Sequence, residues 1–344
     1  AVTEEMQQQG IRLETAVAAS TYYMGFNMLD PVVGGRTEQE KVSARKLRQA
    51  ISIAVDYEEY VSIFANGRGI PAQGPIPPGI MGYREGKEGM NSIVHQWVDG
   101  RIKRRSIEEA KKLLAEAGYP DGIDIKTGAP LVLYFDATSR SADDKSVLDW
   151  MRKQFKKINI QLVVRSTDYN RFQDKMRKGN AQIFEWGWNA DYPDPENFLF
   201  LLYGPQSKAG NHSGNNAANY DNPEYNRLFE RMEKMDNGPE RQAIIDQMVE
   251  ILRNDAPWLW GYHPKDYALY HEWYQNVKPN KMSYNNMKYL RINAELRDRK
   301  QNEWNQPMIW PIGLGVVLLI LGLLPGVIAY RQKERKTEIK QLAK

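Results

Sequence analysis

The residues best suited to chemistry lie between Glu185 and Phe200, in the run Glu-Trp-Gly-Trp-Asn-Ala-Asp-Tyr-Pro-Asp-Pro-Glu-Asn-Phe-Leu-Phe. The two indoles beside Gly187 can supply apolar walls, and the carboxylate of Asp191 can receive a cation or an amine. These residue types therefore indicate a site for a small solute. They equally suit a structural loop with tryptophans in the core and Asp191 as a helix cap, and the residues alone leave both interpretations open.

A carboxylate pair in the same run would allow acid–base chemistry. Asp191, Asp194 and Glu196 could serve glycoside hydrolysis or hold a cation. Hydrolysis needs two carboxyl groups that converge to about 5 to 9.5 Å, which spacing within a loop does not establish. A membrane-anchored glycan or peptide hydrolase, with Asp191 and Asp194 as acid and base, is therefore kept as an alternative.

Other catalytic signatures are missing from the sequence. The four histidines show no metal-ligand spacing, and they are His95, His212, His263 and His271. The sequence has no nucleophile elbow, phosphate-binding loop or dinucleotide fingerprint. Without cysteine there is no disulfide, thiolate zinc site or cysteine nucleophile. We therefore expect a protein that is not an enzyme and that needs no cofactor or metal.

The elements around the run must hold it at the end of a strand. Apolar residues from Gln182 to Trp186 predict a strand, and Pro193 and Pro195 disfavour helical angles in the residues before them. A loop at the carboxyl end of a strand is where open α/β sheets bind ligands.

The rest of the pattern alternates between strands and helices. Strands are expected at Ser20–Asn27, Leu131–Phe135, Ile160–Val164, Ala181–Trp186, Trp258–Tyr262 and Met282–Ile292. Helices are expected at Thr37–Val55 and Ser106–Gly118, both opening with a capping box, and at Ala142–Lys157, Tyr169–Lys178, Glu224–Met235 and Pro239–Asn254. The run from Asn66 to Tyr83 is too rich in Gly and Pro for either. Such alternation predicts an α/β fold with a parallel or mixed sheet.

The C-terminal region differs from the rest. From Ile309 to Ala329 no residue is charged, which matches the about 20 apolar residues of a membrane-spanning helix. Trp310 and Tyr330 stand at its ends, and a basic tail follows that accounts for the whole net charge of +4. This flank predicts a single pass with a cytoplasmic C-terminus and the large domain outside, although a buried core helix is an alternative. The remainder is neutral, so no nucleic-acid partner is expected.

Several motifs, taken in order, resemble the extracellular solute-binding proteins of family 5, the oligopeptide and dipeptide receptors of ABC importers. They are Ser20 to Asn27, Lys46-Leu-Arg-Gln-Ala-Ile-Ser-Ile-Ala-Val-Asp-Tyr, Pro71-Ala-Gln-Gly-Pro-Ile-Pro-Pro-Gly, Ala110-Lys-Lys-Leu-Leu-Ala-Glu-Ala-Gly-Tyr-Pro-Asp-Gly, Trp188-Asn-Ala-Asp-Tyr-Pro-Asp-Pro and Asn254-Asp-Ala-Pro. The resemblance runs from about Thr21 to Ile292.

This resemblance implies a two-lobed receptor of the periplasmic-binding-protein type II fold that closes on a peptide or small-molecule solute and delivers it to ABC permease subunits. In peptide-binding members the Asp of Gly-Trp-x-x-Asp meets the α-amino group of the ligand, and Gly187 to Asp191 match that motif. A buried ammonium needs such a partner, because an unpaired buried charge is costly. The predicted ligand-binding residues are Asp191, Trp188, Asn189, Trp186, Tyr192, Tyr22 and Tyr23.

The same resemblance suggests how the chain is divided. The expected parts are 1–32 as the end of the first lobe, 33–282 as the second α/β lobe, 283–306 as a return and stalk, 307–330 as the transmembrane helix and 331–344 as the tail. The chain starts with Ala1 near the crossover between lobes, which suggests a processed or truncated chain. Its C-terminal span is unlike the usual tethering of the family. A sensor ectodomain is therefore a further alternative, and the solute is not identified.

Overall fold

The computed structural model describes residues 2–138, 143–278 and 285–342, which form two units. The first runs to Tyr270 and includes Lys278 and the described residues up to Lys288. The second contains His271–Val277 and the chain from Tyr289 onward. This division does not coincide with the lobe boundaries expected at residues 32 and 282, and the lobes stay a proposal.

The elements follow one another along the chain in this order: α1 (Glu4–Gln8), β1 (Ile11–Val17), β2 (Ser20–Phe26), α2 (Glu38–Ala54), α3 (Tyr57–Ile63), β3 (Gly69–Pro71), α4 (Gly86–Gly89), β4 (His95–Val98), β5 (Arg101–Arg104), α5 (Ile107–Glu116), η1 (Pro120–Gly122), β6 (Val132–Thr138), α6 (Asp143–Lys156), β7 (Gln161–Thr167), α7 (Tyr169–Arg177), β8 (Ile183–Asn189), α8 (Glu196–Leu199), η2 (Phe200–Leu202), η3 (Gly204–Gln206), α9 (Pro223–Met232), α10 (Pro239–Asp255), β9 (Trp258–His271), β10 (Tyr274–Gln275), η4 (Met287–Tyr289), β11 (Arg291–Ile292), α11 (Ala294–Trp304) and α12 (Trp310–Leu342).

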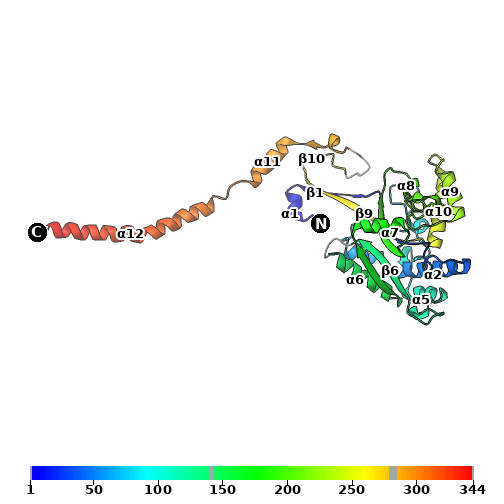
Figure 1. Cartoon of the computed structure of the whole chain (residues 1–344). Coiled ribbons are helices and arrows are strands. Elements are labelled where there is room, and N and C mark those ends of the chain that lie inside the picture. Colours follow the sequence, from blue (N-terminus) through cyan, green and yellow to red (C-terminus); the bar gives the residue numbers. More distant parts are fainter. Residues whose placement is uncertain (1, 139–142, 279–284, 343–344) are drawn as a thin grey trace. The chain divides into compact units, whose positions relative to one another are not determined.

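One mixed sheet organises the larger unit (Figure 1). Its strand order is β1-β9-β2-β8-β6-β7, and β3 also pairs with β9. β6 is parallel to β7 and β8, whereas β2 is antiparallel to β8 and β9. The predicted α/β class with a mixed sheet is confirmed.

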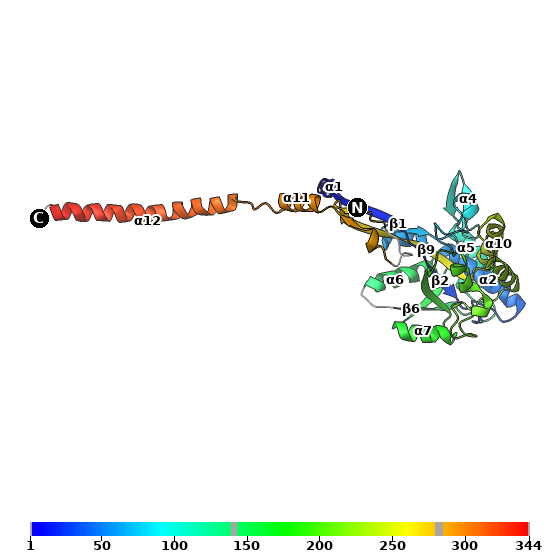
Figure 2. The same cartoon turned by 90° about the horizontal axis from the view of Figure 1, so that it is seen from above.

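Helices cover both faces of this sheet, because its strands are apolar on both sides. On one face Leu47 of α2 and Phe155 of α6 pack in one buried cluster with Phe135 of β6. On the other face Phe172 of α7 packs in a second cluster with Phe184 of β8. Figure 2 shows α6 and α7 on opposite sides of β6.

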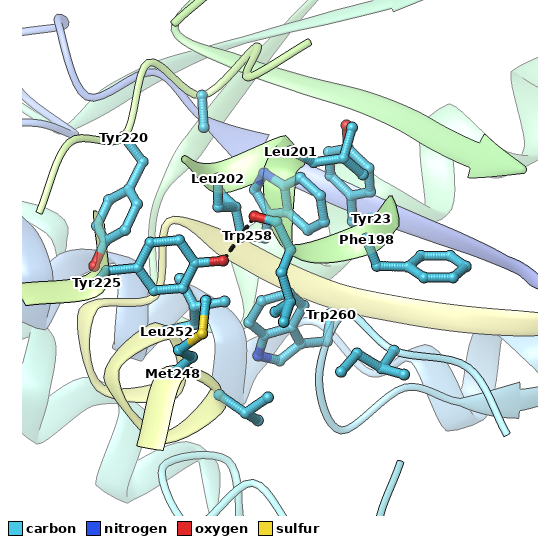
Figure 3. Close-up of a cluster of buried hydrophobic side chains, with 14 of the residues drawn as sticks. Tyr23, Phe198, Leu201, Leu202, Tyr220, Tyr225, Met248, Leu252, Trp258 and Trp260 are labelled. Carbon is cyan, nitrogen blue, oxygen red and sulfur yellow. Dashed lines mark hydrogen bonds between the residues drawn. The ribbon is translucent and has the colours of Figure 1, made fainter. Parts of the chain in front are cut away.

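Aromatic rings dominate the centre of the second cluster (Figure 3). Tyr23 of β2 stacks on Trp258 of β9, with ring centres 3.4 Å apart. Tyr225 of α9 donates a hydrogen bond of 2.7 Å from its hydroxyl to the carbonyl oxygen of Leu199. This bond satisfies the polar end of a side chain that is otherwise fully buried.

Two helices begin with the capping boxes that the sequence predicts. Thr37 accepts from the backbone N–H of Glu40, whose side chain accepts in return from the backbone of Thr37. Ser106 and Glu109 make the same reciprocal pair at the start of α5. Each box satisfies backbone donors that a helix end would otherwise leave free.

The main correction concerns β8. The sequence predicts that this strand stops at Trp186, but it continues to Asn189, which pairs with Ser20. Gly187 and Trp188 therefore lie in the sheet, because β2 runs alongside and supplies hydrogen-bonding partners. The loop begins only after the strand.

Other boundaries also shift. β9 extends well beyond the predicted end at Tyr262. Of the strand expected at Met282–Ile292, only β11 is a strand in the described part, and residues 279–284 lie outside it. The expected start of α6 at Ala142 also lies outside the described residues.

The smaller unit carries the apolar C-terminal helix. The predicted stalk is helical as α11. Trp304 at the end of this helix packs with the rings of His271 and Trp273 within the same unit. α12 includes the predicted span and continues through the basic tail to Leu342. By length and composition α12 is able to cross a membrane.

Candidate functional site

The strands β6 and β8 part toward their carboxyl ends. Their pairing joins Phe135 to Ile183 and Asp136 to Phe184, and within the described residues it goes no further. The chain reaches β7 from β6 through α6, and β8 from β7 through α7, on opposite faces of the sheet. The strand order therefore reverses at β6, and open α/β sheets bind ligands in the crevice at such a reversal.

A cavity of about 320 Å³ opens in this crevice. It is lined by Tyr22, Tyr60, Ala137, Thr138, Asp144, Val147, Leu148, Tyr169, Phe172, Glu185, Trp186 and Gly187. Its volume lies at the lower end of the range for small-molecule sites. Two of the predicted site residues, Tyr22 and Trp186, are in its wall.

Gly187 allows Tyr22 to lie over β8 at this cavity. A Cβ atom at Gly187 would stand only 2.7 Å from Cδ1 of Tyr22. The Tyr22 ring is stacked on its other neighbour, Tyr262, at 5.1 Å between ring centres. The glycine of the motif thus makes room for an aromatic wall.

Glu185 is the acidic residue of β8, and it faces the cavity. The residue is half-buried, and within the described chain its carboxyl group has no hydrogen-bond or ion-pair partner. Burial, together with the negative charge of Asp144 on α6, raises the pKa of Glu185 to about 7. This carboxyl group is thus poorly satisfied in its ionised form.

Asp191 lies in the loop that follows β8, and its side chain is exposed. Asn197 of α8, which is buried, fixes this loop through its amide group. Its Oδ1 accepts from the backbone N–H of Asp191 at 2.9 Å and from the indole N–H of Trp188 at 3.1 Å. Its Nδ2 lies 3.4 Å from the Asp191 carboxylate. The carboxylate is therefore oriented and, among the described residues, has no cationic partner.

The remaining predicted site residues are spread around this loop and the core. Trp188 packs edge-on against Phe200, with ring centres 5.4 Å apart. Asn189 is exposed and accepts a hydrogen bond from the hydroxyl of Ser20 at 2.8 Å. Tyr192 is exposed and donates to Glu196.

Tyr23 stands apart from the others. It is buried in the second core cluster, on the opposite side of β2 from Tyr22. The structure therefore brings Tyr22 and Trp186 together at the cavity and Trp188 and Asp191 together at the loop, but places Tyr23 with neither.

Asp194, three residues beyond Asp191, has a different environment. Its two oxygens accept from Arg241 at 2.7 and 2.8 Å, and the backbone N–H of Glu196 donates to it. Burial alone would raise the pKa of Asp194, but the hydrogen bonds from Arg241 and Glu196 hold that pKa below its usual value. A general acid needs a raised pKa, so this geometry does not favour a hydrolase with Asp191 and Asp194.

A larger cavity of about 480 Å³ lies elsewhere, between α10 and the loop before α4. Its charged groups already contact one another: Arg84 pairs with Asp246 at 2.9 Å and Arg253 with Glu250 at 3.6 Å. Because these charges are satisfied within the chain, the crevice beside β8 is the better candidate.

The described residues contain no cluster of three metal-ligating side chains. His95 is hydrogen-bonded to Glu58 at 2.7 Å, and His263 to the carbonyl oxygen of Ser20 at 3.1 Å. Burial lowers the pKa of His263 to about 4, so its ring is neutral at physiological pH. These two histidines have structural partners.

The sequence did not single out several of the cavity residues. Glu185 carries one usable signal, since it is a charged residue inside the apolar strand that runs through Phe184 and Trp186. Tyr60 and Tyr169 carry none, because only the folded chain brings α3 and α7 to the crevice.

An α/β sheet with a crevice at its strand reversal is suited to binding a ligand, and comparison with known proteins identifies the family. Residues 2–210 match the family described as "Bacterial extracellular solute-binding proteins, family 5 Middle". The chain belongs to this family.

Among curated relatives, the chain is 28% identical over 233 residues to "Heme-binding protein A" of Haemophilus influenzae, which covers 67% of the chain and 39% of the relative. It is 23% identical over 252 residues to the "Dipeptide-binding protein" of Escherichia coli, covering 73% of the chain and 42% of the relative. The chain thus spans well under half the length of these relatives. They are binding proteins, in keeping with a protein that is not an enzyme.

Solved structures show the same fold. The structure of HbpA2 from Haemophilus parasuis matches with a TM-score of 0.66 at 21% identity, over 84% of this chain and 52% of that one. The periplasmic binding protein DppA from Helicobacter pylori, in complex with the peptide STSA, matches with a TM-score of 0.64 at 20% identity, over 85% and 51%. The fold is the α/β periplasmic-binding-protein type II fold.

Proposed function

We propose that this chain is the substrate-binding component of an ABC importer, and that it captures a peptide or similar amine-bearing solute and delivers it to the permease. The carrying observation is the exposed carboxylate of Asp191, which Asn197 orients at the end of β8 and which no described cation neutralises. Related proteins whose names specify peptides support this class of solute.

The backbone of β8 offers a second contact. Beyond Phe184 its edge toward β6 has no strand partner among the described residues. A free strand edge can pair with an extended peptide through main-chain hydrogen bonds, whatever the side chains of the peptide. Trp186, Trp188, Asn189, Tyr192 and Tyr22 would then contact the solute around this edge, with Asp191 at one end.

The anchoring ammonium can be tested by charge removal. Asp191→Asn keeps the shape of the side chain, so a solute ammonium would lose its partner at a cost of about 2 to 5 kcal/mol. We expect tetra-alanine to bind the variant roughly 30-fold to several-thousand-fold more weakly, measured by calorimetry on the full chain in detergent with any co-purifying subunits. N-acetylated tetra-alanine, which has no ammonium, should be nearly insensitive to the substitution. Equal binding of tetra-alanine to parent and variant would make Asp191 a structural residue.

Anchoring by α12 is the other part of the proposal. The helix has the length and hydropathy of a membrane span over Trp310–Arg335, and its apolar window is not buried inside the structure, unlike the core helix of a soluble protein. With the basic residues after Tyr330 on the cytoplasmic side, the solute-binding domain would lie on the periplasmic or extracellular side. We propose a single-pass protein of the cell membrane with residues 33–282 as its second lobe.

Protease accessibility tests this topology. Protease added to cells with a permeabilised outer envelope should digest the domain before Trp310. It should spare an epitope fused to the C-terminal end of the tail that begins at Arg331. Protection of the large domain would reverse the orientation, and release of the intact chain by alkaline carbonate would contradict the span.

A further inference from the structure

The cavity beside β8 has two acidic groups and no basic one among the described residues that line it. Glu185 projects from β8, and Asp144 lies on the first turn of α6. Arginine and lysine pairs satisfy Asp194 and several other carboxylates of this chain, but no such partner reaches Glu185 within the described residues. A half-buried carboxyl group is costly to keep ionised without a partner, so a cationic group of a solute would stabilise it.

The walls of the cavity favour a cation. The rings of Tyr22, Tyr60, Tyr169 and Trp186 border it from four different elements. Aromatic faces attract ammonium and guanidinium groups, most strongly where water is partly excluded. A flexible alkyl arm that ends in a positive charge would therefore contact aromatic carbon along its length and meet Glu185 at its end.

Titration of Glu185 agrees with this geometry. Its charged and titratable neighbours are Asp144 of α6, Tyr57 and Tyr60 of α3, and Tyr262 of β9, with Tyr22 and Tyr169 also in the cavity wall. None is a base. An incoming cation would favour the ionised form of Glu185, so binding near neutral pH would release a proton.

The cavity is separate from the Asp191 loop. Glu185 and Asn189 are four residues apart on one strand, which is about 13 Å, and Asp191 lies two residues further. An extended peptide whose α-ammonium is at Asp191 would bring its third or fourth side chain near Glu185.

We propose that this cavity is a subsite for a second cationic group of the solute, such as a lysine or arginine side chain, with Glu185 as its counter-ion. The inference rests on the proposed function, because it assumes a solute whose first amine is held at Asp191. The subsite adds a preference for a solute with a second cationic group, which the proposed function does not require.

Matched tetrapeptides test the subsite. Alanine tetrapeptides with one lysine at position two, three or four are compared by calorimetry with peptides that carry norleucine, which has a similar length and no charge. On the full chain at pH 8, one lysine position should bind about tenfold more tightly than its norleucine partner. Glu185→Gln should abolish that preference and leave the norleucine peptides unchanged, and Asp191→Asn should weaken both peptides of each pair.

Two further measurements guard against a misfolded variant. In the parent protein the lysine preference should fall about tenfold from pH 8 to pH 5.5, as Glu185 takes up its proton. Asp144→Asn should retain part of the preference. Two results would overturn the subsite while the proposed function stands. The first is tight binding of all peptides without a lysine preference, and the second is a lysine preference that Glu185→Gln leaves intact. If no peptide binds the parent, the proposed function fails and the subsite with it.

Discussion

Two acidic regions border β8, and they differ in what their carboxyl groups contact. In the loop after the strand, Asp194 is held by a two-pronged ion pair with Arg241, whose side chain is only 4% exposed. In the crevice, Glu185 faces a cavity with no partner among the described residues. The first carboxyl group is satisfied by its own chain, and the second is available to a solute.

The two environments move the pKa in opposite directions. Arg241 and a backbone N–H outweigh burial and keep the pKa of Asp194 below its usual value, whereas burial and Asp144 raise the pKa of Glu185 to about 7. A carboxyl group that stabilises the fold should thus be ionised at neutral pH, and one kept for a ligand should be easier to protonate. Substitutions in the two regions should have different consequences.

The largest effect is expected at the paired carboxylate. Asp194→Asn leaves the buried guanidinium of Arg241 without its charged partner, so the free energy of unfolding should fall by about 3 to 5 kcal/mol. For a domain of this size that lowers Tm by roughly 6 °C or more, measurable by thermal unfolding of the chain in detergent.

Asp191→Asn is the matched control in the same loop. Its side chain is exposed and has no ion pair among the described residues, so stability should change by less than about 0.5 kcal/mol. If Asp194→Asn and Asp191→Asn destabilise the chain equally, Asp194 is not a structural carboxylate that differs from Asp191.

The sequence predicts the helices and strands of the fold better than it predicts the crevice. Capping boxes at Thr37 and Ser106 and the alternating strands and helices are local signals, and the structure bears them out. The continuation of β8 to Asn189 has no local signal in the sequence, because its partner β2 lies far away along the chain. The pairing of Asp194 with Arg241 is equally remote in sequence.

The cavity shows the same limit more clearly. The sequence predicts Trp186, Tyr22 and Tyr23 as ligand contacts; Trp186 and Tyr22 line the cavity, but Tyr23 is buried in the core. Adjacent residues of a strand point to opposite faces, and of the two tyrosines of β2 only Tyr22 faces the cavity. Which of them does depends on the helices that cover each face.

An intermediate effect is expected at Gly187, because only a residue without a side chain leaves room for the Tyr22 ring in the crevice wall. A new Cβ would lie 2.7 Å from the Tyr22 ring, so Gly187→Ala should displace that ring and cost about 1 to 3 kcal/mol of stability. Gly238→Ala is the control, because its Cβ meets no atom within 4 Å and its backbone is extended. The lysine preference of the subsite should weaken in the first variant only, and an unaltered preference would mean that Tyr22 is not part of the site.

The smallest effect, and the sharpest test of the comparison, is the pH dependence of stability at Glu185. Its pKa is about 7 in the folded chain and 4.5 as an ordinary side chain. A raised folded-state pKa adds stability that is fully present below pH 4.5 and is lost as pH rises through 7. The full shift would correspond to about 3 kcal/mol, and partial exposure should reduce this to about 1 to 2 kcal/mol. Relative to the parent, Glu185→Gln should therefore become more stable as pH rises from 5 to 8, by a Tm difference of about 2 to 6 °C.

Asp144→Asn removes the charge that helps raise the pKa of Glu185. This variant should therefore lose less stability than the parent between pH 5 and pH 8. A Tm difference between Glu185→Gln and parent that stays constant with pH would mean that Glu185 is already satisfied like Asp194, and the two acidic regions beside β8 would then not differ.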